Sequence, residues 1–429
     1  MSVIYGNPIV TSGGGCSLNI DYGSNPPSDT TKLWVPLATK PSAVECSPAL
    51  AFGGNTISLE NWMLPSDVAF YPNPIVYGGY LYLVGGGQQQ YYGSGSNKIF
   101  KVNLKTNQVT EISTKLPKQL HYSFCAEANG KLYILGGCST QSNVSLPDVY
   151  VFDPATETVT TKTSLSVGIK MGSSYPFKHG FYHNGLIYIV GYMTGDNTSN
   201  SKVLSYNTAN GSTTIGASVP AIGSACSLVG SKIYCFGGQS YQKWYTYDVL
   251  TGVVTSHDSP DYPYTYVDCA SIGKYVYLFT GWLQGAPSNV IQRFDTETNT
   301  LEQLSATMKN KLGWRTVCKY GLDIYVLGGK TSSGAPNLEV EKFSASSPLT
   351  SNHLFLQEDY GYDGLWTALK SKDTDLKVKV INAYLGDSNN IAQLTNAYLY
   401  DSKDLKWKSL SGESYVADMQ NALNILGVN

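Results

Sequence analysis

The stretch Tyr82-Leu83-Val84-Gly85-Gly86 decides the fold, because its pattern returns five more times along this chain of 429 residues. The pattern is a tyrosine, two apolar residues, and a glycine at the next position or the one after it. Successive tyrosines lie 51, 55, 46, 43 and 48 residues apart, and a period of this length is typical of repeat architectures. The other copies are Tyr133-Ile134-Leu135-Gly136-Gly137, Tyr188-Ile189-Val190-Gly191, Tyr234-Cys235-Phe236-Gly237-Gly238, Tyr277-Leu278-Phe279-Thr280-Gly281 and Tyr325-Val326-Leu327-Gly328-Gly329.

Two further features give each repeat the form of a small antiparallel sheet. A glycine marks a tight turn before each tyrosine, and the glycines after it allow neighbouring sheets to approach closely. Downstream, an aromatic residue or Val precedes an Asp or Asn, whose side chain caps the next turn. The turn glycines are Gly79, Gly130, Gly185, Gly230, Gly273 and Gly321, and the downstream pairs are Val102-Asn103, Phe152-Asp153, Tyr206-Asn207, Tyr247-Asp248 and Phe294-Asp295.

The sixth unit departs from this pattern, because it reads Phe343-Ser344 where the others have Asp or Asn. Four short strands in a repeat of about 50 residues form one blade of a β-propeller. One blade cannot bury both of its faces, so the blades must stack. The sequence therefore predicts an all-β fold built around a six-bladed β-propeller.

This pattern resembles the kelch repeat, and the resemblance covers about residues 55–343. It implies a propeller that binds a partner or, in some members of the family, carries an enzyme site in the central channel. The repeats depart from the family in one respect. Kelch units usually have a Trp in the outer strand, whereas most units here have Val or Thr, so the function of the family is not carried over.

The ring must also close between its first and last blades. The segment Ile57–Leu64 looks like an outer kelch strand, including its Trp62, but no blade precedes it. We predict that this segment pairs into the sixth blade as its outermost strand. The alternative is that Leu349–Gln357 fills that position.

The sequence outside the repeats predicts two further regions: residues 1–45 as an attachment segment and residues 350–429 as a small β-rich module, with the propeller over 46–349. In the module, Asn382–Ser388 returns as Asn396–Ser402, and a short helix is expected over Tyr415–Leu426. The Gly- and Pro-rich leader and this repeat resemble parts of bacteriophage tail and fibre proteins. That resemblance implies a virion protein, assembled in the host cytoplasm, whose N-terminal segment binds other virion proteins and which is a homo-oligomer.

Composition argues against several other functions. The net charge is −2 and no run of basic residues is present, which disfavours nucleic acid as a partner. No apolar stretch is long enough to span a bilayer, and the N-terminus lacks the features of a secretory signal, so we expect a chain that folds in a cytosol from near Met1. The eight cysteines show neither a CxxC pair nor metal-site spacing. We therefore expect no cofactor and no metal.

The best candidates for ligand binding are the variable loops after the glycines, which should emerge on one face of the ring. Aromatic side chains beside amide groups suit sugar rings and protein partners, such as a host-surface glycan or protein. The expected ligand-binding residues are Gln89, Tyr91, Tyr92, Tyr192, Tyr241, Trp244 and Trp282.

A second group of residues is expected at the mouth of the central channel, namely Lys178, His179, Asp268 and Arg315. No nucleophile–base pair and no phosphate-binding loop accompanies them. The favoured interpretation is a non-enzymatic virion adhesion protein. The alternative is a sugar-modifying kelch-type enzyme, similar to a mutarotase or an oxidase, with its site at the channel mouth.

Overall fold

The computed structural model divides the chain into two compact units. One unit comprises Ile57–Lys319 and Ile324–Phe343, and the other comprises Met1–Thr56, Tyr320–Asp323 and Ser344–Asn429. The residues that the structure describes are 20–22, 28, 33–35, 55–70, 73–87, 95–104, 106–139, 144–170, 180–193, 201–220, 225–236, 243–258, 264–265, 268–272, 274–279, 281–283, 286–320, 323–331, 334–345, 353–358, 378–386, 391–393, 398–401, 406–409 and 415–417.

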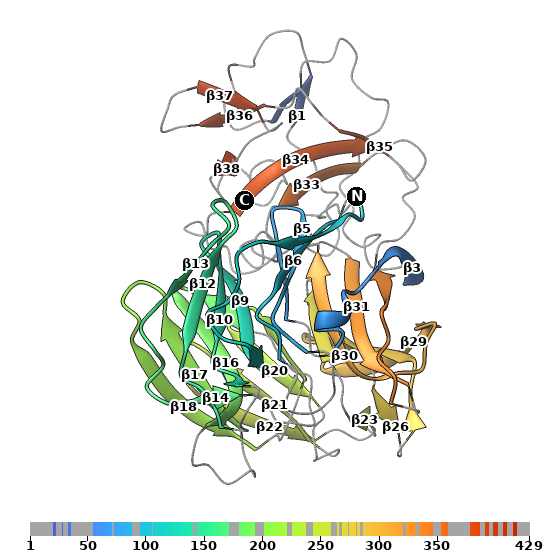
Figure 1. The fold of residues 1–429 in the computed structure, drawn as a ribbon. Helices are drawn as coiled ribbons and strands as arrows, with labels where there is room; N and C mark the ends of the chain where they lie inside the picture. Colours follow the sequence, from blue (N-terminus) through green and yellow to red (C-terminus); the bar gives the residue numbers. More distant parts are fainter. Residues whose placement is uncertain are drawn as a thin grey trace. The chain divides into compact units, whose positions relative to one another are not determined.

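The first unit is the predicted six-bladed β-propeller, and each blade is an antiparallel sheet (Figure 1). In the first three blades the strands follow one another along the chain from the inner to the outer edge. Blade 1 comprises β4 (Pro74–Tyr77), β5 (Tyr80–Val84), β6 (Ile99–Asn103) and β7 (Val109–Ile112); blade 2 comprises β9 (Phe124–Ala128), β10 (Lys131–Leu135), β12 (Val149–Asp153) and β13 (Thr158–Thr161); blade 3 comprises β15 (Phe181–His183), β16 (Leu186–Met193), β17 (Ser201–Asn207) and β18 (Thr213–Val219).

Blades 4 and 5 repeat this order, but blade 6 does not. Its outermost strand comes from the N-terminal side of the first blade. Blade 4 comprises β19 (Ala225–Val229), β20 (Lys232–Phe236), β21 (Lys243–Asp248) and β22 (Val254–Asp258); blade 5 comprises β24 (Asp268–Ile272), β25 (Tyr275–Phe279), β28 (Val290–Asp295) and β29 (Thr300–Thr307); blade 6 comprises β30 (Gly313–Tyr320), β31 (Asp323–Lys330), β32 (Glu339–Ser344) and β3 (Thr56–Met63).

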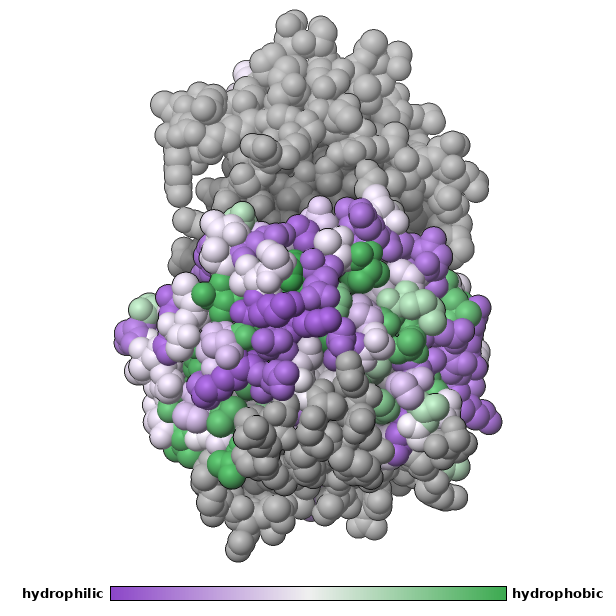
Figure 2. All heavy atoms as spheres, in the orientation of Figure 1, coloured by the Kyte–Doolittle hydropathy of each residue, from purple (hydrophilic) through white to green (hydrophobic). Residues whose placement is uncertain are grey.

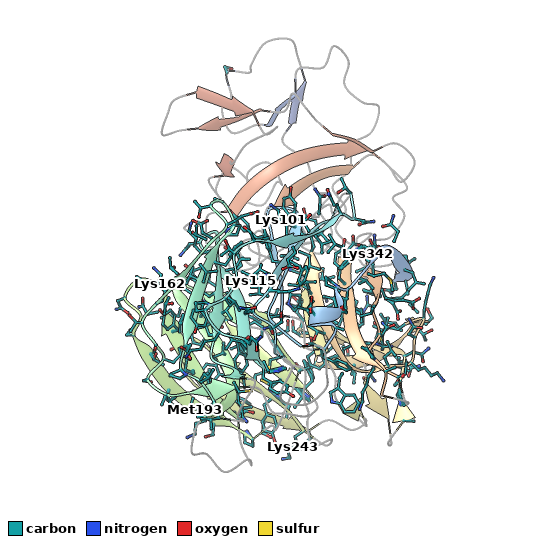
Figure 3. All side chains as sticks on the ribbon, in the orientation of Figure 1. Lys101, Lys115, Lys162, Met193, Lys243 and Lys342 are labelled. Atoms are coloured by element: carbon teal, nitrogen blue, oxygen red, sulfur yellow. The ribbon has the colours of Figure 1, made fainter. Side chains whose placement is uncertain are left out.

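The position of β3 confirms the predicted ring closure. In Figure 1 the blue β3 stands beside the orange strands of blade 6, and it pairs with β32. The Leu64 N–H donates to the Leu338 carbonyl at 2.8 Å, and Lys342 forms an ion pair with Glu60 at 3.0 Å (Lys342 is labelled in Figure 3). The strand that was the alternative, β33 (His353–Glu358), pairs with β34 (Val378–Gly386) in the other unit.

An aromatic contact joins successive blades and explains why the repeat conserves two aromatic positions along the chain. The repeat tyrosine of one blade packs on the residue before the Asp or Asn of the next blade, with ring centroids 5.0–6.4 Å apart. In blade 1 that position is the buried Val102, which is not aromatic. The five pairs are Tyr82–Phe152, Tyr133–Tyr206, Tyr188–Tyr247, Tyr234–Phe294 and Tyr277–Phe343.

The turn residues do what the sequence predicts. The glycine before the repeat tyrosine adopts a positive φ, for example 75° at Gly130, a conformation that other residues rarely take. At Gly137 a Cβ would stand 2.6 Å from the His121 carbonyl oxygen, so only glycine fits there. The capping side chains accept backbone N–H bonds two or three residues on: Thr106 to Asn103, Ala155 to Asp153, Ala209 to Asn207, Leu250 to Asp248 and Glu297 to Asp295.

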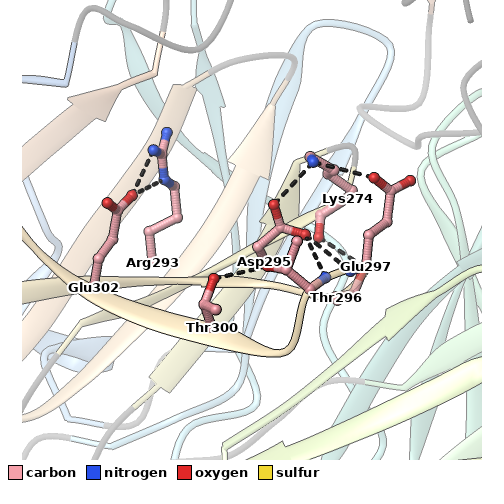
Figure 4. A network of polar contacts seen from close by, with 8 residues as sticks. Lys274, Arg293, Asp295, Thr296, Glu297, Thr300 and Glu302 are labelled. Carbon is pink, nitrogen blue, oxygen red and sulfur yellow. Dashed lines mark hydrogen bonds and ion pairs between the residues drawn. The ribbon is translucent and has the colours of Figure 1, made fainter. Parts of the chain in front are cut away.

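The turn of blade 5 adds a network of charges to this cap (Figure 4). Lys274 pairs with Asp295 at 2.8 Å and with Glu297 at 3.1 Å, and Arg293 pairs with Glu302 at 2.5 Å. Burial opposes the ionisation of Asp295, but hydrogen bonds from Lys274 and from two backbone N–H groups outweigh it and lower its pKa. The carboxylate therefore stays ionised and holds the turn.

The other unit is also built from strands where it is described. One sheet has the order β1 (Ile20–Tyr22), β2 (Leu33–Val35), β36 (Tyr398–Asp401) and β37 (Lys406–Ser409), and in the other β34 pairs with β33, β35 (Ile391–Gln393) and β38 (Tyr415–Ala417). The first three residues of the helix expected over Tyr415–Leu426 thus form a strand, and the rest lies outside the described residues. The expected boundaries at 45/46 and 349/350 also lie outside them.

Candidate functional site

The candidate binding surface is the end of the propeller that carries the connections between the second and third strands of each blade. Because the strands are antiparallel, the connection from one blade to the next emerges at the same end. We call this end the loop face, and we call the opposite end, with the Gly and Asp/Asn turns, the turn face. All expected ligand-binding residues were placed in the loop-face connections.

In three blades the two loop-face connections pair with each other to form short ribbons. In blade 2, β8 (Leu120–His121) pairs with β11 (Cys138–Ser139), and in blade 3, β14 (Ile169–Lys170) pairs with the end of β16. In blade 5, β26 (Trp282–Leu283) pairs with both β23 (Tyr264–Thr265) and β27 (Ala286–Pro287). The ribbons fix the backbone of the loop face, as a rigid binding surface requires.

Two expected binding residues lie in these ribbons rather than in free loops. Tyr192 is opposite Lys170 in the blade 3 ribbon, and Trp282 is opposite Thr265 in the blade 5 ribbon. The sequence placed both at the start of loops because a glycine precedes each of them, but the second strand of blade 3 continues through Gly191 to Met193. Gln89, Tyr91, Tyr92 and Tyr241 lie outside the described residues.

The expected loop position of Trp244 was wrong, because this residue lies in β21, and its side chain is 7% exposed. Its indole stacks on the His257 ring at 3.8 Å between centroids, and it meets Phe294 of blade 5 edge-on at 4.8 Å. The signal was available in the sequence. A strand of five or six residues that ends at Tyr247-Asp248 must already contain Trp244.

The two described residues of the expected channel-mouth group are buried. Asp268 is 0% exposed and Arg315 is 1% exposed, whereas Lys178 and His179 lie outside the described residues. A carboxylate or guanidinium so far from water requires compensating hydrogen bonds. Both residues have them, and the bonds lead to a neighbouring blade.

Asp268 joins the innermost strand of blade 5 to that of blade 6. Its Oδ2 accepts the Val317 N–H at 2.8 Å, and its Oδ1 accepts the N–H of Cys269 at 2.9 Å. Asn73 stands at the same repeat position in blade 1 and makes an equivalent link. Its amide donates to the Ser123 hydroxyl of blade 2 at 2.7 Å. This position therefore connects blades.

Arg315 ties blade 6 back to the end of blade 5. Its guanidinium donates to the Ser288 carbonyl at 3.3 Å, to the Met308 Sδ at 2.7 Å and to the Asn310 carbonyl. Glu341 holds the same segment from the other side by accepting the N–H groups of Lys309 at 2.6 Å and Asn310 at 3.1 Å. Burial lowers the pKa of Arg315 to about 10 against the opposing effect of Glu341, so the group remains charged at neutral pH.

The structure also places residues on the loop face that sequence reasoning missed. Trp314 and Tyr122 occupy the same repeat position, at the start of the innermost strand of blade 6 and just before that of blade 2, and have φ of 56° and 53°. Bulky side chains rarely adopt this left-handed conformation, and such residues concentrate at binding sites. Tyr122 is buried, but Trp314 is partly exposed, and the Lys330 Nζ lies 3.9 Å from its ring centroid. Alignment of the repeats shows that the two residues share a position, but it does not reveal their left-handed backbone conformation.

A thiol, an imidazole and an amine lie near one another where blades 2 and 3 meet. Cys138 is opposite His121 in the blade 2 ribbon, and the Cys138 thiol interacts electrostatically with Lys170. Burial raises the pKa of Cys138 to about 11, and burial lowers the pKa of Lys170. The thiol is therefore protonated at neutral pH and is not an activated nucleophile. Within the described residues, no group of three His, Cys, Asp or Glu side chains is arranged to hold a metal ion.

In a comparison with protein families, residues 121–166 match the model of the kelch motif. The matched range covers blade 2 from the end of β8 to just beyond β13, and the same strand order recurs in the other blades. The chain therefore contains a kelch motif within a six-bladed β-propeller, a fold associated with protein binding and with enzymes. A search of curated proteins found no match.

Proposed function

We propose that this chain is a non-enzymatic adhesion protein of a bacteriophage virion, whose kelch propeller binds a host-surface or virion partner through the loop face. Residues 1–45 would attach the propeller to other virion proteins. The protein would be assembled in the host cytoplasm and would act in the virion as an oligomer.

The observation that carries this proposal is that the two expected sites differ in structural role. Asp268 and Arg315 use their hydrogen-bonding groups to connect blades 5 and 6, so they belong to the scaffold. The ribbons of the loop face, in contrast, hold aromatic residues on a fixed backbone. A rigid aromatic surface binds a partner at a low entropic cost.

The described surface of the propeller mixes polar and apolar side chains. On the face that Figure 2 shows, hydrophilic and hydrophobic side chains are interspersed among the coloured residues. The large hydrophobic side chains that are most exposed among the described residues lie in different blades, such as Leu250 at 68% and Val144 at 57%. No helix among the described residues is long and apolar enough to cross a membrane.

The test replaces loop-face side chains in the full-length protein. The variant carries Gln89→Ala, Tyr91→Ala, Tyr92→Ala and Tyr241→Ala, and binding is measured on glycan arrays and on candidate host cells. We expect affinity to fall at least tenfold, since each aromatic anchor of an interface contributes about 1–2 kcal/mol. The matched control, Leu250→Ala with Val253→Ala on the turn face, should bind as the parent does. Equal binding by both variants would refute the choice of surface.

The alternative of a sugar-modifying enzyme is tested separately. Wild-type protein is incubated with a panel of free sugars, and their anomeric exchange and oxidation are followed by NMR. The proposal expects rates equal to those in buffer. Catalysis that disappears with Lys178→Ala or His179→Ala would replace the adhesion proposal with the enzyme.

A further inference from the structure

Blade 4 holds two thiols in contact across its two innermost strands. Cys226 on β19 and Cys235 on β20 are direct partners in the antiparallel register. The Cys226 S–H donates to the Cys235 Sγ at 3.3 Å, and both are buried, free cysteines. A disulfide bond is about 2.05 Å long, so the two sulfurs need to approach by only about 1.2 Å to bond.

The backbone already has a geometry that a disulfide can bridge. Directly opposite residues on antiparallel strands have Cα atoms about 4.5–5.5 Å apart. Disulfides bridge Cα separations of about 4.4–6.8 Å. Small rotations about the two Cα–Cβ bonds are therefore enough to form the bond, and the pairing of β19 with β20 is retained.

The pairing is a property of blade 4 and not of the repeat. Blades 2 and 5 also have a cysteine at this position of the innermost strand, Cys125 and Cys269. Those cysteines stand opposite Ile134 and Leu278. They share the burial and strand position of Cys226 but have an aliphatic residue opposite them. Cys269 also interacts electrostatically with Cys226 and Cys235, so Cys125 is the simple internal control and Cys269 the stringent one.

The contact also keeps the Cys226 thiol protonated. The hydrogen bond with Cys235 and burial raise the pKa of Cys226 well above its ordinary value. The S–H group therefore stays in place and holds the two sulfurs in contact in the folded protein. Because both thiols are buried, only a small oxidant reaches them.

We propose that Cys226 and Cys235 are a redox modification site that hydrogen peroxide converts into a cross-strand disulfide. One of the two sulfurs attacks a peroxide oxygen, the O–O bond breaks, and the departing hydroxide takes the proton of the attacking thiol to become water, which leaves a sulfenic acid. The other sulfur then displaces the sulfenic oxygen, which leaves as hydroxide and takes the proton of that second thiol. Two thiols lose two electrons, and one peroxide becomes two waters.

The expected consequence is a more stable blade 4 in an oxidising medium, because the bond restricts the unfolded chain. This inference goes beyond the proposed function and does not depend on it. A protein made in a reducing cytosol would carry the thiols, and exposure to peroxide would add the bond without a change of fold.

The experiment treats the folded, full-length protein with hydrogen peroxide, then denatures it and alkylates the remaining thiols before mass spectrometry. The chain has eight cysteines, and we expect eight alkylated thiols before oxidation and two fewer after it, with a crosslinked peptide that joins Cys226 to Cys235. The melting temperature should rise by a few degrees and fall back with dithiothreitol.

Matched variants make the result specific. Cys226→Ala and Cys235→Ala should each lose both the crosslink and the reversible rise in melting temperature, whereas Cys125→Ala and Cys269→Ala should retain both. If peroxide leaves eight thiols intact, gives only irreversible oxidation, or crosslinks other cysteines, the proposal is overturned. Near-ultraviolet circular dichroism recorded throughout shows that oxidation takes place in the folded state.

Discussion

Blade 2 and blade 6 have the same four-stranded architecture, but the chain builds them in different ways. The strands of blade 2 lie one after another between residues 124 and 161, and the kelch motif matches this part of the chain. Blade 6 takes three strands from residues 313–344 and its outer strand from residues 56–63. The comparison teaches that the repeat sequence depends on the turns between consecutive strands as much as on the strands of the blade.

The drift of the sixth repeat follows from this difference. In blade 2, Asp153 caps the turn that leads from the third strand to the fourth. In blade 6 the outer partner of the third strand, β32, is β3, which precedes it along the chain, so no hairpin turn joins the third strand to the fourth. Ser344 stands where the other blades have Asp or Asn, and the position has no turn to cap.

The blades also place their charges differently. Blade 2 has a surface ion pair between Lys131 and Asp153, whereas blade 6 buries Arg315 and Glu341 around the segment that enters it. Surface pairs contribute little to stability, but loss of one partner in a buried network is costly. Blade 6 should therefore respond more strongly to substitution.

The largest effect is expected in the closing strand. Trp62 on β3 is 3% exposed, and Trp62→Ala should lower the free energy of unfolding by about 3–5 kcal/mol through the cavity that it leaves. Met63 on the same strand is 53% exposed, so Met63→Ala should change it by less than about 0.5 kcal/mol. Urea denaturation measures both. Equal effects would mean that β3 does not complete the core of blade 6.

A smaller loss is expected from the buried charges of the same blade. Glu341→Ala removes the acceptor of two backbone N–H groups and the negative charge near Arg315, and should cost about 3 kcal/mol. Glu341→Gln, which retains an acceptor oxygen, should cost less. The same urea titrations compare the two, and if both variants are as stable as the parent, the network does not hold the blade 5–6 joint.

In blade 2, Asp153→Asn should lower stability by about 1 kcal/mol at pH 6. The hydrogen bond from Lys131 holds the pKa of Asp153 below its ordinary value, so the carboxylate stabilises the folded state above about pH 4. That contribution disappears as the pH falls through the lowered pKa. Urea midpoints of variant and parent should therefore differ at pH 6 and converge near pH 3. A constant difference would show that the effect is not due to ionisation.

The smallest effect is expected where blade 6 lacks the turn. Ser344→Asp restores the residue of the repeat consensus, but with no following turn it should change the free energy of unfolding by less than about 0.5 kcal/mol. Its counterpart, Asp248→Ser in blade 4, weakens a cap that accepts the Leu250 N–H and should be measurably destabilising. Thermal melts of the two variants give the comparison. A clear gain from Ser344→Asp would contradict our explanation of the drift.

The fold could be predicted from the sequence because its determinants are local. The tyrosine and glycine positions fix the second strand of each blade, the Asp or Asn fixes the following turn, and the spare strand with Trp62 indicates the closure. The roles of Asp268 and Arg315 could not be predicted. Their partners, Val317 and Ser288, are determined by how neighbouring blades stack. Sequence periodicity places a residue within its own blade but does not say which residues of the next blade it contacts.

Trp244 shows the complementary failure. Its aromatic side chain and its Tyr-rich surroundings suited a binding loop, but the length of the strand that contains Tyr247 places it in the sheet, where it packs on Phe294. The position within the strand predicted the location of Trp244 better than the residue type did. Trp314 escaped notice for a different reason, since a left-handed backbone at a tryptophan leaves no mark in the sequence.

The junction between blades 6 and 1 differs in its sequence from the other five. At five junctions the repeat tyrosine pairs with a ring of the next blade, whereas blade 1 has Val102 at that position, and blade 6 takes its outer strand from residues 56–63. Heat or tension should part the circle there first, and amide hydrogens of β3 and β6 should exchange with solvent sooner than those at the other junctions. If the ring opens at the junction between blades 6 and 1, that junction is also the position at which another blade could be inserted.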